Sequence, residues 1–486
     1  MDIYSYIKSC IHLNTEAFFG EGDYDCTYAG LFEIVSSFSA KLCALNLFQK
    51  RIILYFEDPY LEAISILAVL ASGNIVVPVS MKYGEALTRN ILEQADADLI
   101  VTDGKDNLTQ TASCNILHIG YHNLKCLGKT SVGQIPEISE DDLAFIMFTS
   151  GTTGIPKGVM LTHKNVVSNL ESISGYFNVT AKDRILIARP LYHIAVMTGE
   201  LLYGLSRGAA ISFYRFDYNP VLLLKHIREK DITVFGGTPT LLYHLARFCN
   251  NERLPLRNIV VSGERLAKAV VEQIAGAFYY ASIYHVYGLT EASPRVAALQ
   301  PDMFCEKVGS IGKPIKNVVV KIVGENGCEV SGNTVGELTV NGPNVTTGYW
   351  KNVPLTVEKI KAGWLYTGDM GYRDKEGYLY IVGRKDNMII RSGMNIYPQE
   401  IENQLLQYEE FQEVLVYGKD DILFGQKICL KVVLNPHFDI DKAGILAICR
   451  KALQTHHMPA EIKIVNKLER NASGKIIRKM RQVPEV

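Results

Sequence analysis

The sequence lacks an excess of charge of either sign. Among its 486 residues, 50 Lys and Arg balance 51 Asp and Glu, and the formal net charge is −1. Near-neutrality argues against a basic protein that binds nucleic acid. The apolar fraction of 48%, together with the low net charge, also excludes an intrinsically disordered chain. The length fits two or three domains with a large buried core.

The sequence also lacks paired cysteines and targeting signals. Its ten cysteines form no C-x-x-C pair, which disfavours a zinc ribbon or a disulfide framework. The first ten residues lack the basic and apolar regions of a signal peptide, so none is expected, and the C-terminal Pro-Glu-Val does not match a peroxisomal signal. The most apolar stretch, residues 61–80, contains Glu62, Asn74 and Pro78, so it fits a buried helix and strand. We therefore expect a cytoplasmic protein with reduced thiols, no membrane span and no nucleic-acid partner.

Apolar runs of strand length alternate with helical patterns over most of the first 380 residues. The pattern predicts strands at 51–56, 74–80 and 98–103, separated by helices at 60–72 and 86–95. Such alternation favours parallel strands with helices on the faces of the sheet. After residue 300, short strands separated by Gly, Asn and Pro predict an antiparallel region. The expected fold class is therefore α/β, with a large N-terminal domain of parallel-type layers and a β-rich subdomain.

The last 100 residues predict a small α+β domain of their own. A helix is expected to begin with Pro398 in its first turn, and a second helix covers residues 443–455. A charged turn at residues 384–386 interrupts two apolar strands. We therefore expect an N-terminal domain over 1–384 and a C-terminal domain over 385–486.

The densest local signal is the string TSGTTGIPKG at residues 149–158, which follows an apolar strand and precedes a helical pattern beginning near Lys164. Small residues let the backbone approach an anion, and hydroxyl and N–H groups can line the concavity. Lys157 adds a positive charge for a phosphate. Neither the Walker A nor the dinucleotide-binding spacing fits. The alternative is a turn without a ligand.

Five segments resemble the motifs of the adenylate-forming superfamily, which includes acyl-CoA synthetases, adenylation domains of peptide synthetases and beetle luciferases. They are TSGTTGIPKG (149–158), YGLTEAS (287–293), YTGDMG (366–371), GRKDNMIIRSGMNIYPQEIE (383–402) and NASGKIIRK (471–479). The resemblance implies that ATP activates a carboxylic acid as an acyl-adenylate, that pyrophosphate leaves, and that the acyl group then passes to a thiol. Two anions meet in the first step, so charge neutralisation and positioning must supply most of the rate.

The resemblance implies roles for individual residues. The phosphate loop would contribute Thr149, Ser150, Gly151, Thr152, Thr153, Gly154 and Lys157. Thr290 would contact the α-phosphate and Glu291 would coordinate Mg²⁺, which prefers hard oxygen ligands. Without that resemblance, a Thr-Glu pair of this kind would be read as a helix N-terminus.

Other positions would bind the nucleoside. Gly263 and Glu264 would line the adenine pocket, and Tyr287, followed by Gly288, would cover the adenine face. His285 stands where relatives carry an amide or carboxylate, so it is either an adenine contact or a core histidine.

The ribose and the reacting groups would be held by three further residues. Asp369 would accept hydrogen bonds from both ribose hydroxyls, and Arg384 would add a ribose or phosphate contact. Lys475 would lie between the acid carboxylate and the α-phosphate, unless this cationic segment is merely a solvated tail. Asp386 would be the hinge of a mobile C-terminal domain, and Gly393 would face the site only during thiol transfer.

The segment at residues 190–201 resembles the wall of the acid pocket, with His193 as its gate. Relatives that activate amino acids carry Asp where this chain has Ile194, and an ammonium group there would be buried without a partner. Met197 continues an apolar wall, and Gly288 leaves room for depth. We therefore expect a small, apolar carboxylic acid without an α-amine.

The expected thiol is CoA, and the chain would then be an acyl- or aryl-CoA ligase. The main alternative is a free-standing acyl-[acyl carrier protein] ligase, with a phosphopantetheinyl carrier in trans. Three further classes remain: a luciferase-like oxygenase, a P-loop kinase or NTPase, and a non-catalytic nucleotide-binding regulator.

Overall fold

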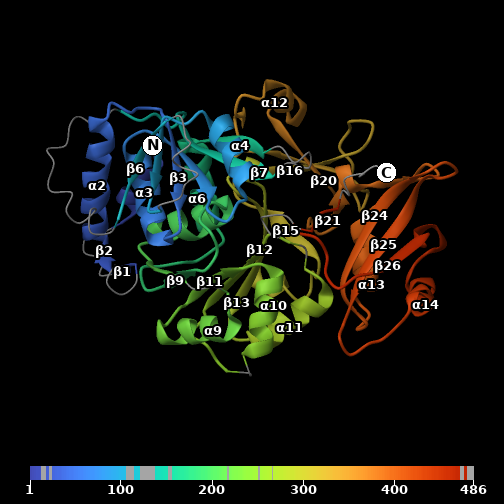
Figure 1. Ribbon diagram of the computed structural model, residues 1–486. Helices are drawn as coiled ribbons and strands as arrows, with labels where there is room; N and C mark the ends of the chain where they lie inside the picture. Colours follow the sequence, from blue (N-terminus) through green and yellow to red (C-terminus); the bar gives the residue numbers. More distant parts are fainter. Residues whose placement is uncertain are drawn as a thin grey trace.

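The computed structural model describes residues 1–11, 18–20, 25–104, 114–120, 137–150, 156–215, 218–249, 252–264, 266–470 and 476–478, with only the backbone for Phe18 and Ser150. The strands in these ranges form three sheets (Figure 1). The expected mixed α/β fold, with a large N-terminal domain and a C-terminal domain, is confirmed.

The first sheet contains the alternation predicted from the sequence. Its parallel strands are β3 (Arg51–Phe56), β4 (Ile75–Ser80), β5 (Leu99–Thr102) and β6 (Asn115–His118), connected in part by α3 (Pro59–Ala71) and α4 (Glu85–Ala95). Asp58 caps α3, and every residue from Tyr60 to Ala71 is buried. This burial explains why the most apolar stretch of the chain is a core helix and strand. Among the described residues, no helix is long and apolar enough to cross a membrane.

An antiparallel hairpin completes this sheet. β7 (Leu143–Ser150) lies parallel to β4 and pairs with β8 (Pro156–Thr162), which in turn pairs with β18 (Gly348–Tyr349). Thr162 caps the following helix, α6 (His163–Ser174), in a capping box with Asn165. The helix predicted near Lys164 is therefore confirmed.

The second sheet joins a parallel half to an antiparallel half. The parallel half holds β10 (Ala210–Phe213), β9 (Arg184–Ile187), β11 (Val234–Gly237), β12 (Asn258–Ser262) and β13 (Ser282–Gly288). Its strands pack against α9 (Pro220–Glu229), α10 (Pro239–Phe248) and α11 (Lys268–Ala277) in one apolar cluster. The antiparallel half continues through β14 (Arg295–Leu299), β15 (Ser310–Pro314), β21 (Leu379–Arg384), β20 (Trp364–Arg373), β17 (Gly336–Asn341) and β16 (Val319–Val323). The change from parallel to antiparallel pairing therefore occurs near residue 300, where the sequence predicted it.

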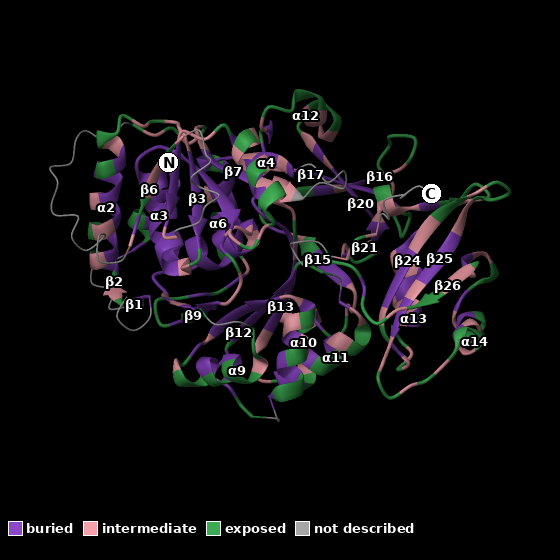
Figure 2. Cartoon of the chain, viewed as in Figure 1, coloured by how far each residue is buried: buried purple, intermediate pink, exposed green. Residues whose placement is uncertain are grey.

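A continuous helix lies between β9 and β10. It comprises α7 (Ile194–Val196), the π-helical turn η3 (Met197–Leu202) and α8 (Tyr203–Ser206), and residues 196–206 are all buried. The N-terminal helices α1 (Ile3–Cys10) and α2 (Tyr28–Ala44) pack near α3 and share the largest apolar core, which appears as the buried interior in Figure 2. The π-turn is unpredicted; such turns often occur at functional sites.

The C-terminal part has a separate apolar core. It is built from β22 (Ile389–Arg391), β23 (Met394–Ile396), α13 (Pro398–Leu405), β24 (Phe411–Asp421), β25 (Gly425–Leu434), α14 (Lys442–Ala452) and β26 (Glu461–Ile464). Pro398 begins α13, as expected. Figure 1 shows these elements grouped together at one end of the molecule. The division between residues 384 and 385 stays a prediction.

Candidate active site

The parallel strands of the second sheet bring several predicted residues to one edge. β12 ends at Ser262, directly before Gly263 and Glu264, and β13 ends at Gly288, directly after Tyr287. The strands β9, β11, β12 and β13 are neighbours and parallel (Figure 1). In open α/β sheets, ligands bind outside the carboxyl ends of the strands. The candidate site is therefore expected at this edge of the sheet.

The hairpin β7–β8 carries the predicted phosphate loop. Thr149 pairs with Lys157 and Ser150 with Pro156, and Thr149 Oγ1 lies 3.5 Å from the Lys157 carbonyl oxygen. The hairpin holds the two ends of the loop together. Gly151, Thr152, Thr153 and Gly154 lie outside the described residues, as does the Ser150 side chain.

Glu291 lies between the two sheets. It sits in the short helix η4 (Thr290–Ala292), which begins two residues after the end of β13, and the Tyr349 hydroxyl donates to its Oε1 over 2.9 Å. Tyr349 belongs to β18 and pairs with Val159 of the phosphate-loop hairpin. Burial and the Glu291 carboxylate raise the pKa of Tyr349. The predicted metal ligand is therefore held near the hairpin that carries the predicted phosphate loop by a tyrosine that the sequence analysis missed.

Asp369, Arg384 and Tyr287 form one network. Arg384 Nη1 donates to Asp369 Oδ1 over 2.9 Å, and the Tyr287 hydroxyl donates to Asp369 Oδ2. Asp369 is only 6% exposed. Burial, followed by the Asp369 carboxylate, raises the pKa of Tyr287 well above its usual value. The tyrosine therefore stays protonated, and three residues from separate motifs are in contact; their roles toward a nucleotide stay predictions.

His285 is buried in β13, where its Nδ1 lies 2.8 Å from the Ser310 carbonyl oxygen. Burial lowers the pKa of His285, so the ring is neutral near pH 7. One ring nitrogen is thus engaged by the protein, as in a core histidine. A contact with adenine stays a prediction.

His193, the predicted gate, precedes α7, and its ring centroid lies 4.3 Å from that of Tyr192. Ile194 and Met197 are buried, in agreement with an apolar wall. Three residues further along the same helix, however, the buried Glu200 forms an ion pair with Arg189. The helix therefore carries charge as well as apolar surface.

The predicted hinge and thiol-transfer residues lie in the C-terminal part. Asp386 sits in a short 3₁₀ turn after β21, with its Oδ2 3.8 Å from Arg384 Nη2. Gly393 is exposed in the β22–β23 turn at a φ of 78°, a conformation that favours glycine. Lys475 lies outside the described residues. On either side of its segment, Arg470 forms a β-bridge with Ile476, and Arg478 Nη2 donates to Glu402 Oε2 over 2.8 Å.

Two family models match the chain. A model of the AMP-binding enzyme covers residues 11–350, and a model of the AMP-binding enzyme C-terminal domain covers residues 400–475. The chain belongs to the AMP-binding enzymes. The expected adenylate-forming acid–thiol ligase is thereby confirmed at the level of the family.

Individual relatives of this AMP-binding enzyme match most of its length. It is 32% identical over 465 residues to a 2-succinylbenzoate–CoA ligase from Oceanobacillus iheyensis, covering 93% of each chain. It is 33% identical over 353 residues to a long-chain-fatty-acid–CoA ligase from Salmonella typhimurium, covering 71% of this chain and 62% of that relative. A solved structure of O-succinylbenzoate coenzyme A synthetase from Bacillus subtilis, in complex with ATP and magnesium ion, superposes with a TM-score of 0.86 at 26% identity, covering 97% and 98% of the two chains.

The residues of the AMP-binding enzyme fit a magnesium ion that arrives with ATP. Within the described ranges, no group of three or more His, Cys, Asp and Glu side chains could hold a metal without a substrate. Mg²⁺ is typically held by one or two carboxylates together with substrate phosphates and water. Glu291, fixed beside the phosphate-loop hairpin, would supply one such carboxylate, and this role stays a prediction.

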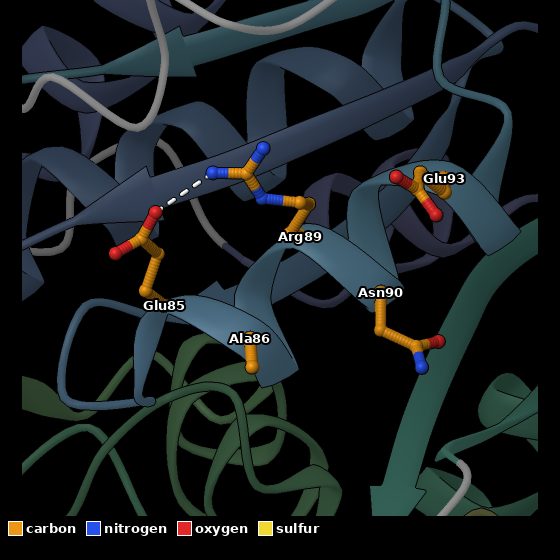
Figure 3. Close-up of a pocket in the computed structure, with 5 residues that line it drawn as sticks. All are labelled: Glu85, Ala86, Arg89, Asn90 and Glu93. Atoms are coloured by element: carbon orange, nitrogen blue, oxygen red, sulfur yellow. Dashed lines mark hydrogen bonds and ion pairs between the residues drawn. The ribbon is translucent and has the colours of Figure 1, made fainter.

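A separate surface pocket lies on α4 and contains none of the predicted site residues. It is lined by Glu85, Ala86, Arg89, Asn90 and Glu93, all from one helix (Figure 3). Arg89 Nη2 lies 2.7 Å from Glu85 Oε1, four residues earlier in the chain. These side chains form the solvated face of an amphipathic helix.

Proposed function

We propose that this AMP-binding enzyme activates a carboxylic acid that has an apolar body and no α-amine, and that it transfers the acyl group to CoA. The observation that carries the proposal is the meeting of Tyr287, Asp369 and Arg384 in one network. Glu291, fixed beside the phosphate-loop hairpin, adds a carboxylate for the metal.

In the first step, the acid carboxylate attacks the α-phosphate of ATP, the bond to the β-phosphate oxygen breaks, and pyrophosphate leaves. Lys157 and the phosphate loop bind the phosphates, and Thr290 positions the α-phosphate. Lys475 neutralises the approaching carboxylate. Bound through Glu291, Mg²⁺ would supply charge neutralisation of the phosphates. Preorganised groups of this kind stabilise charge without reorganising during the reaction.

The nucleoside would lie against the network around Asp369. Asp369 accepts the ribose hydroxyls in exchange for its contact with Tyr287, and Arg384 balances its charge. The hydroxyl of Tyr287 is then released, and its ring covers the adenine. Gly263 and Glu264 line the same pocket from the end of β12.

The acid would enter past His193. Ile194 is buried and carries no charge that could pair with an ammonium group. Met197, also buried, adds apolar surface for the body of the acid. These two residues support a carboxylic acid substrate that carries no α-amine.

In the second step, the CoA thiolate attacks the acyl carbonyl and AMP leaves. We propose that the domain over 385–486 rotates about Asp386 between the steps and brings Gly393 toward the site. The named relatives are CoA ligases, which favours CoA over a carrier protein as the acceptor.

ATP–pyrophosphate exchange, measured over a panel of acids, tests the proposal. Matched pairs of an acid and its 2-amino analogue should show exchange with the acid and little with the amino analogue. Ile194→Asp should weaken the apolar acids because it buries a charge. Preference for the amino analogue would contradict the assignment of Ile194. A thioester assay with CoA and with a phosphopantetheinyl carrier then identifies the acceptor.

A further inference from the structure

Two arginines and one glutamate form a buried charge cluster beyond the gate: Arg189, Glu200 and Arg295. Arg189 Nη2 donates to Glu200 Oε1, and Arg189 Nη1 lies 3.1 Å from Ser262 Oγ. The Arg189 and Glu200 side chains are 12% and 6% exposed, and Arg295 is 3% exposed as a residue. Glu200 forms an ion pair with Arg189 and also interacts electrostatically with Arg295, so two guanidinium groups share one carboxylate and the cluster carries an excess positive charge.

The backbone makes room for this cluster at two glycines. A Cβ at Gly199 would lie 2.6 Å from Arg295 Nη2, and a Cβ at Gly236 would lie 2.4 Å from Glu200 Oε1. Any side chain at either position would collide with a charged group. The charges therefore occupy space that the sequence leaves free of side chains.

The buried charge cluster borders the proposed active site. Arg295 pairs with Gly288 across the β13–β14 hairpin, which also carries Tyr287 and Thr290. Glu200 lies about one helical turn beyond Met197. Arg189 lies two residues after the end of β9, and Ser262 is the last residue of β12. Both therefore lie at the edge of the parallel sheet where ligands bind.

Two polar donors of this region are not used by the protein. Arg189 Nε and Thr198 Oγ1 are buried without a hydrogen-bond partner in the part of the chain that the structure describes, and so is one acceptor of the cluster, Glu200 Oε2. Thr198 is fully buried, on the helix between Met197 and Glu200. Buried donors and unbalanced charge are costly unless something compensates them. A ligand with an anionic oxygen would accept hydrogen bonds from these donors and would balance the excess positive charge.

We propose that the buried charge cluster is a subsite for a second carboxylate on the acid substrate, so that the preferred substrates are dicarboxylic acids with an apolar body. This inference rests on the proposed function. One carboxylate attacks the α-phosphate as described, while the other stays ionised and chemically unchanged against Arg295, Arg189 and Thr198. Arg295 and Arg189 are thus specificity-determining residues.

The test is ATP–pyrophosphate exchange by the full chain with matched acids. The pairs are octanoate with suberate, and 4-phenylbutanoate with its ortho-, meta- and para-carboxy derivatives. At least one diacid should exceed its monoacid in kcat/KM by about 10-fold or more, the typical value of a charge-assisted hydrogen bond. Arg295→Met should abolish that preference while leaving exchange with the monoacid.

Arg257→Met is the matched control. Arg257 pairs with the buried Asp183 over 2.6 Å, but it precedes β12 and so lies at the opposite edge of the sheet. This variant should keep the diacid preference whatever its stability. If Arg295→Met does not fold, Arg295→Lys replaces it and should reduce the preference, because lysine loses the two-pronged contact.

The outcomes separate the two proposals. Exchange with monoacids but no preference for any diacid overturns the inference and leaves the proposed function standing. Equal loss with both acids of a pair in Arg295→Met or Arg295→Lys also overturns it, because the cluster would then be structural. Absence of exchange with every acid overturns the proposed function, and the inference with it.

Discussion

Asp369 and Arg384 lie opposite each other on neighbouring antiparallel strands, with Arg384 Nη1 2.9 Å from Asp369 Oδ1. The pairing register of β20 and β21 therefore places the Arg384 guanidinium next to the Asp369 carboxylate. The carboxylate that is proposed to bind ribose is balanced before any nucleotide arrives.

Arg384→Met should raise the KM for ATP by about 10-fold or more, because it removes a charge-assisted hydrogen bond. Pyrophosphate exchange at varied ATP concentration measures this change. Arg228→Met, which breaks the exposed pair with Glu252, is the control and should leave the KM unchanged. An unaltered KM in Arg384→Met would show that the pair is structural.

Tyr349→Phe should increase the Mg²⁺ concentration needed for half-maximal exchange by about 10-fold, the lower end of the effect of removing a group that orients a metal ligand. The reason is that the phenylalanine no longer fixes Glu291. A magnesium titration measures it. Tyr280→Phe removes a tyrosine hydroxyl that accepts from Leu254 N over 2.8 Å far from Glu291, and it should titrate like the unchanged protein. Identical curves for all three proteins would contradict the metal role.

Lys475→Ala should reduce adenylation by about 10²-fold, the typical effect of losing one preorganised electrostatic group. Transfer of the acyl group from a preformed acyl-adenylate to CoA should survive, because Lys475 is proposed to leave the site between the steps. Single-turnover assays of each half-reaction measure the two rates. Equal losses in both would argue against domain rotation.

Asp386→Pro should slow thioester formation much more than pyrophosphate exchange, because proline fixes φ near −65° and restricts the proposed hinge. Asp386→Ala is the matched variant: it removes the carboxylate near Arg384 without this restriction, and it should keep both activities. Wild-type rates for both steps in Asp386→Pro would place the hinge elsewhere.

The stability of the fold should fall as the pH decreases from about 6.5 to about 4. Burial lowers the pKa of His163 to about 4, and Ile3 N donates to its Nδ1 over 3.2 Å. The unfolded chain binds a proton in this range while the folded chain does not, so the free energy of unfolding should drop by about 3 kcal/mol. Urea unfolding at a series of pH values measures the slope. His163→Gln should show a correspondingly smaller slope, and an unchanged slope would contradict this assignment.

Local patterns predicted much of the fold. The strand at residues 51–56 and the helix starting at Pro398 were predicted correctly, because apolar periodicity and an N-terminal proline act within a few residues. The five motifs indicated the candidate site residues through their resemblance to a family, and the roles of these residues stay predictions. The sequence could not show that Tyr349 reaches Glu291, because 58 residues separate them and β18 must first pair with β8.

The buried charge cluster was also missed, although a signal existed. Glu200 and Arg295 each interrupt an apolar run, and a charge in such a run must find a partner when it is buried. Which partner it finds depends on the packing of a helix against two strands, and that arrangement is not local.

The hydrogen bond from Tyr349 to Glu291 joins two sheets that are built from different parts of the chain. The position of Glu291, the proposed metal ligand, relative to the phosphate-loop hairpin is therefore set where the two sheets meet. Substitutions in the apolar core between them, remote from every motif, should change the magnesium requirement before they unfold the protein. Metal dependence would then report on core packing in this enzyme.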